Sequence, residues 1–328
     1  MTSRLTPGAR VLVTGCAGFL GSHLSERLLE RGHEVLGVDC FSAYYARQIK
    51  ERNLERLRGE PAFSLAEIDL VRDDLRGLLD GVDLIFHLAA QPGVRNSFGG
   101  RFADYVENNV LATQRLLEEA VLTPVKAFTY ASSSSVYGAS PSWPTSERSP
   151  RCPVSPYGMT KLATEELAGV YMRCFGVPVV GLRYFTAYGP RQRPDMAFSK
   201  FLRRALAREP LPVNGDGSQV RDFTFVADVV EGTIAAADRG RPGANYNIGG
   251  GCPVRVVDAI ALIAQLVGRP LAIEKRPAPV GDPARTGCDG ALAEHDLCFA
   301  PRTTLEDGLT AQLEWLLEPT PVPLEEVA

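Results

Sequence analysis

Three glycines at three-residue spacing constrain this chain more than any other feature. Gly15, Gly18 and Gly21 occur in the run VTGCAGFLGSHL, after the apolar segment 10–15 and at the start of the amphipathic segment 19–32. The first segment predicts a strand and the second a helix. A strand that turns at once into a helix needs a tight turn and a close helix–sheet approach, which glycine permits. These residues therefore predict a strand–turn–helix unit of an α/β protein.

The same alternation continues through the first half of the chain. Apolar, β-branched segments bounded by Gly, Asp or Ser predict further strands, and amphipathic segments predict long helices: strands at 34–39, 84–90, 126–132 and 177–185, helices at 101–120 and 156–175. Such alternation favours a Rossmann-type, doubly wound parallel sheet.

The chain is expected to divide into unequal parts. Beyond residue 190 glycine and proline become denser and the regular strand–helix period is lost. We expect a Rossmann domain at 1–185, a smaller C-terminal α/β part at 186–318 with some segments returning to the main sheet, and a loose tail at 319–328.

The glycine turn also predicts a ligand. A helix N-terminus at such a turn suits a pyrophosphate, because its free N–H groups and its dipole favour negative charge. Asp39, at the end of the second predicted strand, can accept bonds from ribose hydroxyls and would repel a 2′-phosphate. The pattern therefore favours NAD over NADP. The alternative is a structural glycine turn with Asp39 capping a loop.

Composition excludes several other classes of function. The formal net charge is −4, from 35 basic and 39 acidic residues, so no nucleic-acid partner is indicated. No apolar run approaches the ~20 residues of a membrane span. The four histidines are scattered and the seven cysteines form no C-x-x-C pair, which argues against a metal site and for reduced thiols in the cytoplasm.

A tyrosine and a lysine stand four residues apart in the predicted helix 156–175. Tyr157 and Lys161 would share one helix face and point at one place. Taken alone, the pair is weak evidence and favours a solvated helix face.

Several motifs occur in one order around this pair. They are the G-x-x-G-x-x-G turn, DL at 69–70, HLAAQPGVR at 87–95, ENNV at 107–110, SSSSVYG at 132–138, Tyr157-x-x-x-Lys161, LRYFTAYGPRQRPDMAF at 182–198 and RDFTFVADVV at 221–230. Over roughly residues 9–318 the chain thus resembles the extended short-chain dehydrogenase/reductases. It is most similar to the nucleotide-sugar 4-epimerases, above all those acting on UDP-glucuronate and UDP-glucose.

The resemblance implies a catalytic group. Tyr157 would be the acid/base, and Lys161 would bond the nicotinamide ribose and help to lower the phenol pKa from about 10 toward neutrality. Ser133 would hold the substrate oxygen, although four consecutive serines leave the register within 132–135 open, and Ser134 could share the contact.

The resemblance also implies a tightly bound NAD that is regenerated in each turnover. Its contacts would come from the glycine turn, the strand ends and the catalytic helix: Gly15, Gly18, Phe19, Leu20, Gly21, Asp39, Asp69, Leu70, Leu88, Ala89, Ala90, Gln91, Asn108, Tyr157, Lys161, Tyr184 and Phe185.

The serine run separates related activities. Sugar 4,6-dehydratases carry an Asp-Glu pair just after the hydroxyl residue, and UDP-glucuronate decarboxylases carry a glutamate two residues after it. Ser134 and Ser135 occupy those positions here. The resemblance therefore implies chemistry at C4 alone, in which the C4 hydrogen is removed, the 4-keto sugar turns over and the hydrogen returns.

The smaller part would bind the UDP-sugar. Arginines suit the diphosphate, and a cation with a hydroxyl suits a C5 carboxylate. The implied substrate contacts are Gln91, Ser133, Ser134, Tyr157, Thr186, Arg193, Val213, Arg221 and Arg285. Thr186 and Arg193 favour UDP-glucuronate over UDP-glucose, unless Arg193 only braces its loop. Arg221 and Arg285 are alternatively surface residues, and uridine against thymidine is left open.

Two functions of other classes remain open at this point. They are an inactive NAD-binding regulator and an oxidoreductase that releases a keto sugar. The helices at 101–120 and 156–175 are expected to pair across a two-fold axis in a homodimer, as in relatives.

Overall fold

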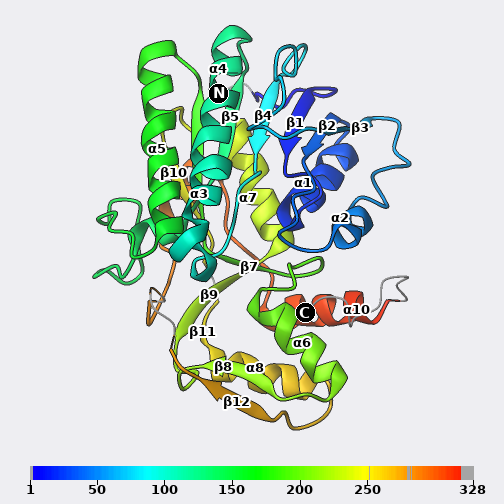
Figure 1. Ribbon diagram of the computed structural model, residues 1–328, viewed down its shortest axis with the longest axis vertical. Coiled ribbons are helices and arrows are strands. Elements are labelled where there is room, and N and C mark those ends of the chain that lie inside the picture. The colour runs from blue at the N-terminus through cyan, green and yellow to red at the C-terminus, as the bar shows by residue number, and fades with distance from the viewer. Residues whose placement is uncertain (1–2, 251, 279–280, 282, 319–328) are drawn as a thin grey trace.

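The main sheet is parallel throughout, as predicted. The computed structural model describes residues 3–250, 252–278, 281 and 283–318. Its seven-stranded sheet has the order β10-β6-β5-β4-β1-β2-β3 (Figure 1). The strands are β1 (Arg10–Thr14), β2 (Glu34–Asp39), β3 (Phe63–Glu67), β4 (Leu84–His87), β5 (Ala127–Ser133), β6 (Val179–Tyr184) and β10 (Asn245–Ile248).

Helices cover both faces of this sheet. Along β1, Leu12 packs in the core that includes α4 (Ala112–Leu122) and α5 (Pro156–Phe175). Its neighbours Val11 and Val13 pack in the core that includes α1 (Phe19–Glu30) and α7 (Val226–Arg239). This period of two, apolar on both sides, explains why the strands read as continuous hydrophobic runs. The predicted Rossmann-type fold class is confirmed.

Two strands of the main sheet were not predicted from the sequence. The edge strand β3 has mostly exposed or half-exposed residues, FSLAE, so no apolar run marks it. Strand β10 lies beyond residue 190 in the sequence and pairs with β6 through Tyr246 and Leu182, so the chain returns to the main sheet after the smaller part has begun.

The helix predicted at 101–120 is wrong in detail. The chain forms α3 (Phe102–Tyr105), a wide π-helical stretch η3 (Val106–Leu111) and then α4. The helix predicted at 156–175 has those bounds, because Ser155 caps it by accepting a hydrogen bond from Gly158 N and Gly176 ends it in the left-handed conformation.

The smaller part has its own core. Its short sheets are β11-β9-β7 and β12-β8, flanked by α6 (Ala197–Ala207), α8 (Val256–Leu266) and α10 (Leu305–Leu317). The strands are β7 (Thr186–Tyr188), β8 (Leu211–Asn214), β9 (Val220–Phe225), β11 (Pro253–Arg255) and β12 (Ile273–Arg276), and α2 (Arg47–Asn53) and α9 (Ala291–Leu297) flank the main sheet. Phe198 and Phe223 stack in this core with ring centroids 4.2 Å apart. The tail predicted at 319–328 lies outside the described residues, and the predicted domain boundaries stay a prediction.

Candidate active site

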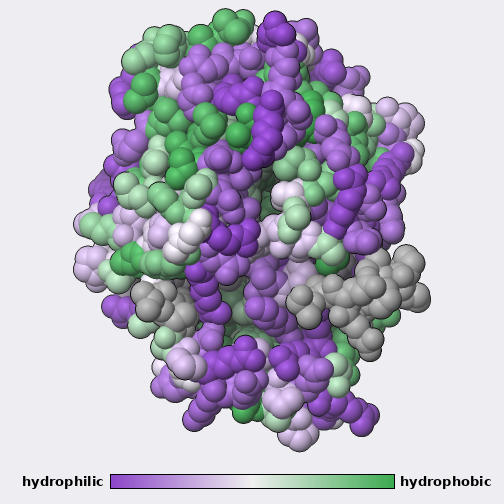
Figure 2. All heavy atoms as spheres, viewed as in Figure 1, coloured by the Kyte–Doolittle hydropathy of each residue, from purple (hydrophilic) through white to green (hydrophobic). Residues whose placement is uncertain are grey.

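A cavity of about 390 Å³ lies at the carboxyl ends of the parallel strands and extends toward the smaller part. This is where open α/β sheets bind ligands. The space-filling view shows a hollow between the upper and lower parts of the molecule, bordered largely by hydrophilic residues (Figure 2). All residues predicted to contact NAD line this cavity, as do the predicted substrate contacts Gln91, Ser133, Ser134, Tyr157, Thr186 and Arg193.

The glycine turn forms one end of the cavity. Gly15 has φ +70° and its N–H donates to Val38 O at 2.7 Å, which holds the turn against β2. A Cβ on Gly15 would lie 2.9 Å from Ala89 N, and one on Gly21 would collide with the Gly15 carbonyl. Helix α1 starts after Gly18 without a side-chain cap among the described residues, so its first N–H groups face the cavity.

Asp39 is buried beside this turn and is already hydrogen-bonded. Its Oδ2 accepts from Ala17 N at 3.1 Å and its Oδ1 from Phe41 N at 2.8 Å. Lys50 Nζ lies 3.7 Å from Oδ1, with both side chains buried. The carboxylate thus braces the loop as well as lining the cavity, and a cation stands next to it that the sequence motifs did not reveal.

The tyrosine–lysine pair of α5 faces the cavity rather than solvent. Burial raises the pKa of Tyr157, while a hydrogen bond with Ser133 and the charge of Arg193 act to lower it. Lys161 Nζ donates to Ala131 O at 2.8 Å, and burial lowers the Lys161 pKa to about 8. The expected lowering of the Tyr157 pKa is therefore absent from the protein alone, because desolvation outweighs the neighbouring charges.

The serine run divides its hydroxyls between two sites. Ser132 Oγ donates to Glu165 Oε1 at 2.5 Å, and Glu165 also accepts from Arg183 Nε at 2.8 Å in a buried ion pair. Ser133 Oγ instead accepts from Ser135 N at 3.1 Å and hydrogen-bonds Tyr157. Of these two serines, only Ser133 shares a hydrogen bond with the tyrosine.

The π-helical stretch positions the loop after β4. Asn109 accepts from Gln91 N at 2.7 Å and donates to Gln91 O at 3.1 Å and to Thr160 Oγ1 at 2.9 Å. It therefore ties the cavity wall to the catalytic helix. Sequence reasoning named its neighbour Asn108 and missed Asn109, although the ENNV motif held both.

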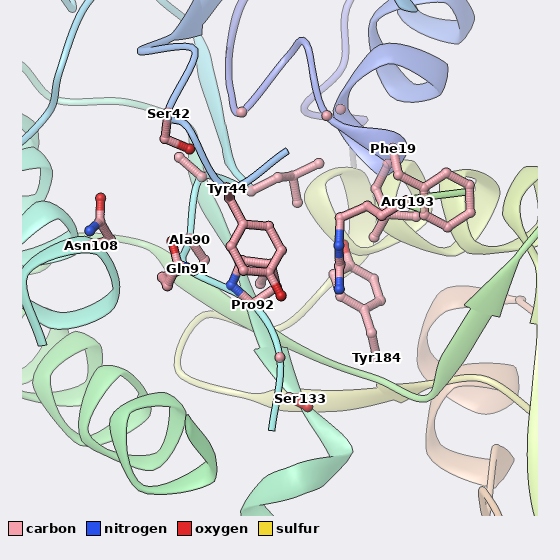
Figure 3. A pocket seen from close by; sticks show the side chains of 18 of the residues that line it. Phe19, Ser42, Tyr44, Ala90, Gln91, Pro92, Asn108, Ser133, Tyr184 and Arg193 are labelled. Atoms are coloured by element: carbon pink, nitrogen blue, oxygen red, sulfur yellow. The ribbon is translucent and has the colours of Figure 1, made fainter. Parts of the chain in front are cut away.

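Arg193 reaches the cavity from the loop between β7 and α6. Its Nε and Nη2 bind Asp195 Oδ1 and Oδ2 at 2.9 and 3.0 Å. The Tyr44 ring, from the loop after β2, lies next to Arg193, whose guanidinium carbon is 5.8 Å from the ring centroid (Figure 3). Sequence reasoning missed Tyr44, since no pattern predicts a contact between loops so far apart in the chain. It also missed Asp195, although the motif at 182–198 held it together with Arg193.

These features match a known family. A family model for the NAD dependent epimerase/dehydratase family matches residues 11–249. The chain belongs to this family. The predicted resemblance is therefore confirmed.

Members of the epimerase/dehydratase family resemble the chain over nearly its whole length. A Bacillus subtilis protein described as an uncharacterized UDP-glucose epimerase, YtcB, is 44% identical over 94% of this chain and 98% of its own. The UDP-glucuronate 4-epimerase of Thermodesulfobacterium geofontis is 34% identical over 94% of this chain and 96% of its own length. Among solved structures, the chain matches the crystal structure of UDP-glucuronic acid 4-epimerase from Bacillus cereus in complex with UDP-glucuronic acid and NAD. The TM-score is 0.91 and the identity 40%, and the match covers 94% of this chain and 98% of that one.

Three predicted substrate contacts do not line the cavity of this epimerase/dehydratase family member. Val213 is buried in the core of the smaller part. Arg221 Nη1 donates to Val220 O at 2.8 Å, and the Arg285 guanidinium lies 5.2 Å from the centroid of the Trp143 ring. Their positions reflect local strand and aromatic packing, and their predicted roles stay predictions.

Proposed function

We propose that the protein is an NAD-dependent 4-epimerase of UDP-sugars and that UDP-glucuronate is its preferred substrate. The observation that carries this proposal is the meeting of Ser133, Tyr157 and Lys161 on one wall of a cavity whose end is the glycine turn. Relatives that act on UDP-glucuronate support the choice of substrate.

The residues present fit NAD. The glycine turn leaves room that any Cβ would fill, and the uncapped start of α1 suits a pyrophosphate. The Gln91 side-chain amide lies beside Tyr105 and lines the cavity, where it can donate to a ligand. When bound, NAD supplies an acceptor that takes the C4 hydrogen as hydride and gives it back.

The chain's own groups would handle the proton and the sugar. Ser133 holds the C4 oxygen, and Tyr157 takes the C4 hydroxyl proton and returns it to the same oxygen after the 4-keto sugar has turned over. Lys161 is buried, and its ammonium group donates a hydrogen bond to Ala131 O in the last part of β5. Its charge favours the phenolate that begins the reaction.

A carboxylate on C5 would meet Thr186 and Arg193. Both line the cavity, and a guanidinium forms charge-assisted bonds to carboxylates. UDP-glucose is the second candidate substrate. The ion pair of Arg193 with Asp195 has no net charge, so it also tolerates an uncharged hydroxymethyl group. In addition, a relative that is 44% identical is described as a UDP-glucose epimerase.

The proposed assembly is a homodimer through α4 and α5. Large apolar side chains are exposed along these helices and the turns that precede α4: Phe98, Phe102, Val106, Leu111, Leu122, Met159, Val170 and Phe175. Exposed apolar residues gathered on one pair of helices are typical of a protein interface.

None of the described helices is long and apolar enough to cross a membrane. All seven cysteines are free, which agrees with the expected cytoplasmic location, itself still a prediction.

The test is incubation of the purified protein with UDP-glucuronate or UDP-glucose and no added NAD. An epimerase converts each accepted sugar to its C4 epimer through many turnovers, with UDP-glucuronate converted faster. An oxidoreductase stops after one equivalent of keto sugar, and a regulator converts nothing. Either of the last two results would overturn the proposal.

A further inference from the structure

The Arg193–Asp195 pair presents one charge to the cavity and keeps the other behind it. Arg193 lines the cavity, whereas Asp195 is not among the described residues that do. The Arg193 side chain is 19% exposed and that of Asp195 37%. The two residues are separated by one position, and Met196 N donates to Arg193 O at 3.1 Å in a turn that holds them together.

Other groups hold Asp195 in its charged form at this place. Tyr44 OH donates to Asp195 Oδ2 at 3.3 Å. Burial raises the Asp195 pKa, but the hydrogen bonds and charge of Arg193, with a further contribution from Lys200, outweigh this effect and the pKa is lowered. The carboxylate is thus ionised at neutral pH and balances a cationic neighbourhood.

This balance acts differently on acidic and neutral sugars. A bound sugar displaces water from Arg193, and an unpaired guanidinium that loses its water carries a large desolvation cost. Asp195 offsets that cost when the C5 substituent is neutral. When the substituent is a carboxylate, Asp195 repels it and shares its cation. One side chain therefore helps the neutral sugar and hinders the acidic one.

We propose that Asp195 is a specificity-determining residue: by pairing with Arg193, it keeps the site open to neutral UDP-hexoses and limits its preference for UDP-hexuronates. This inference rests on the proposed epimerase function. Asp195 accepts from Nε and Nη2 of the guanidinium, and within the described part of the chain no hydrogen bond is formed by Nη1, which is left to meet a ligand. The alternative is that Asp195 only orients Arg193, in which case its loss would weaken hexuronate recognition.

The experiment compares kcat/KM for UDP-glucuronate and UDP-glucose in the wild type, Asp195→Asn and Asp195→Glu. Asp195→Asn should raise the ratio of the two values about tenfold, since one unbalanced cation now favours the acidic sugar. Asp195→Glu, which keeps the charge, should stay near the wild-type ratio. The matched control is Asp74→Asn, because Asp74 pairs with Arg76 at the same two-residue separation on the exposed surface.

Binding separates recognition from turnover. Calorimetric Kd values of both UDP-sugars, measured in the Tyr157→Phe background, should shift in the same direction as the kinetic ratio. An unchanged or lower ratio in Asp195→Asn overturns the inference while the wild-type turnover upholds the epimerase function. A wild type that neither binds nor converts either sugar overturns both.

Discussion

The two ends of the cavity differ in how their residues are held. At the Rossmann end, the glycine turn, Ser133 and Tyr157 are fixed by backbone: a positive φ, a strand end and the first turn of a capped helix. At the sugar end, Arg193 is held by side chains, through Asp195 and the loop that carries Tyr44. Backbone-fixed groups keep the catalytic geometry constant. A side-chain pair, in contrast, can be altered by substitution, which would change the sugar that the site prefers.

The largest effect should come from Tyr157→Phe, at the backbone-fixed end. Loss of a positioned acid/base should lower kcat by about 10²- to 10⁴-fold while bound NAD is retained. Tyr171→Phe on the same helix is the control, because its hydroxyl bonds Gln114 and Glu118 away from the cavity. Normal kcat in Tyr157→Phe would show that another group carries the proton.

Lys161 offers a test of burial at the same end. Its pKa is lowered from 10.5 to about 8, so between these values the native lysine is neutral while the unfolded one is charged. In the cofactor-free protein, the unfolding free energy of the wild type relative to Lys161→Met should therefore rise by about 3 kcal/mol as pH increases through this window. Urea unfolding at pH 8 and pH 10.5 measures the difference. A pH-independent difference would mean that Lys161 is solvated.

At the sugar end, Arg193→Ala should raise KM for UDP-glucuronate by about 10- to 150-fold, the scale of a charge-assisted hydrogen bond. UDP-glucose should be affected far less. Loss of the hold on the carboxylate is also expected to release some 4-keto pentose by decarboxylation. Arg255→Ala is the matched comparison, since Arg255 pairs with Asp258 on the exposed surface and is not among the described residues that line the cavity. Equal losses on both sugars in Arg193→Ala would make Arg193 a brace for its loop.

The smallest expected effect concerns cofactor choice. Asp39→Ala should weaken NAD binding and shift the NAD-to-NADP affinity ratio by about tenfold toward NADP, because Lys50 would lose its partner and attract a 2′-phosphate. Asp39→Asn separates the charge from the hydrogen bonds to the loop. Titration of both cofactors onto the stripped protein measures the ratio, and an unchanged ratio would leave Asp39 only its role in the loop.

The two ends also differ in how far the sequence predicted them. Gly15, Asp39, Tyr157 and their partners line one cavity as expected, because glycine conformations, strand ends and helix faces follow from local pattern. Val213, Arg221 and Arg285 do not line it, because their surroundings depend on how short strands of the smaller part pack. Lys50 was missed because its partner Asp39 is brought to it by tertiary structure, whereas Asp195 was missed although it stands two residues from Arg193 in the same motif.

The wide turn at Val106–Leu111 gives this site an unusual sensitivity to chain length. A π-helical turn holds more residues per turn than an α-helical one, and such turns are frequent at functional sites. Removing one residue there would let the regular helix re-form and would rotate the preceding turn by about 100° relative to α4. Asn109 would then leave Gln91 and Thr160. A single-codon deletion in this stretch would thus disturb the site more than most substitutions, and sequences that keep the site must keep its length.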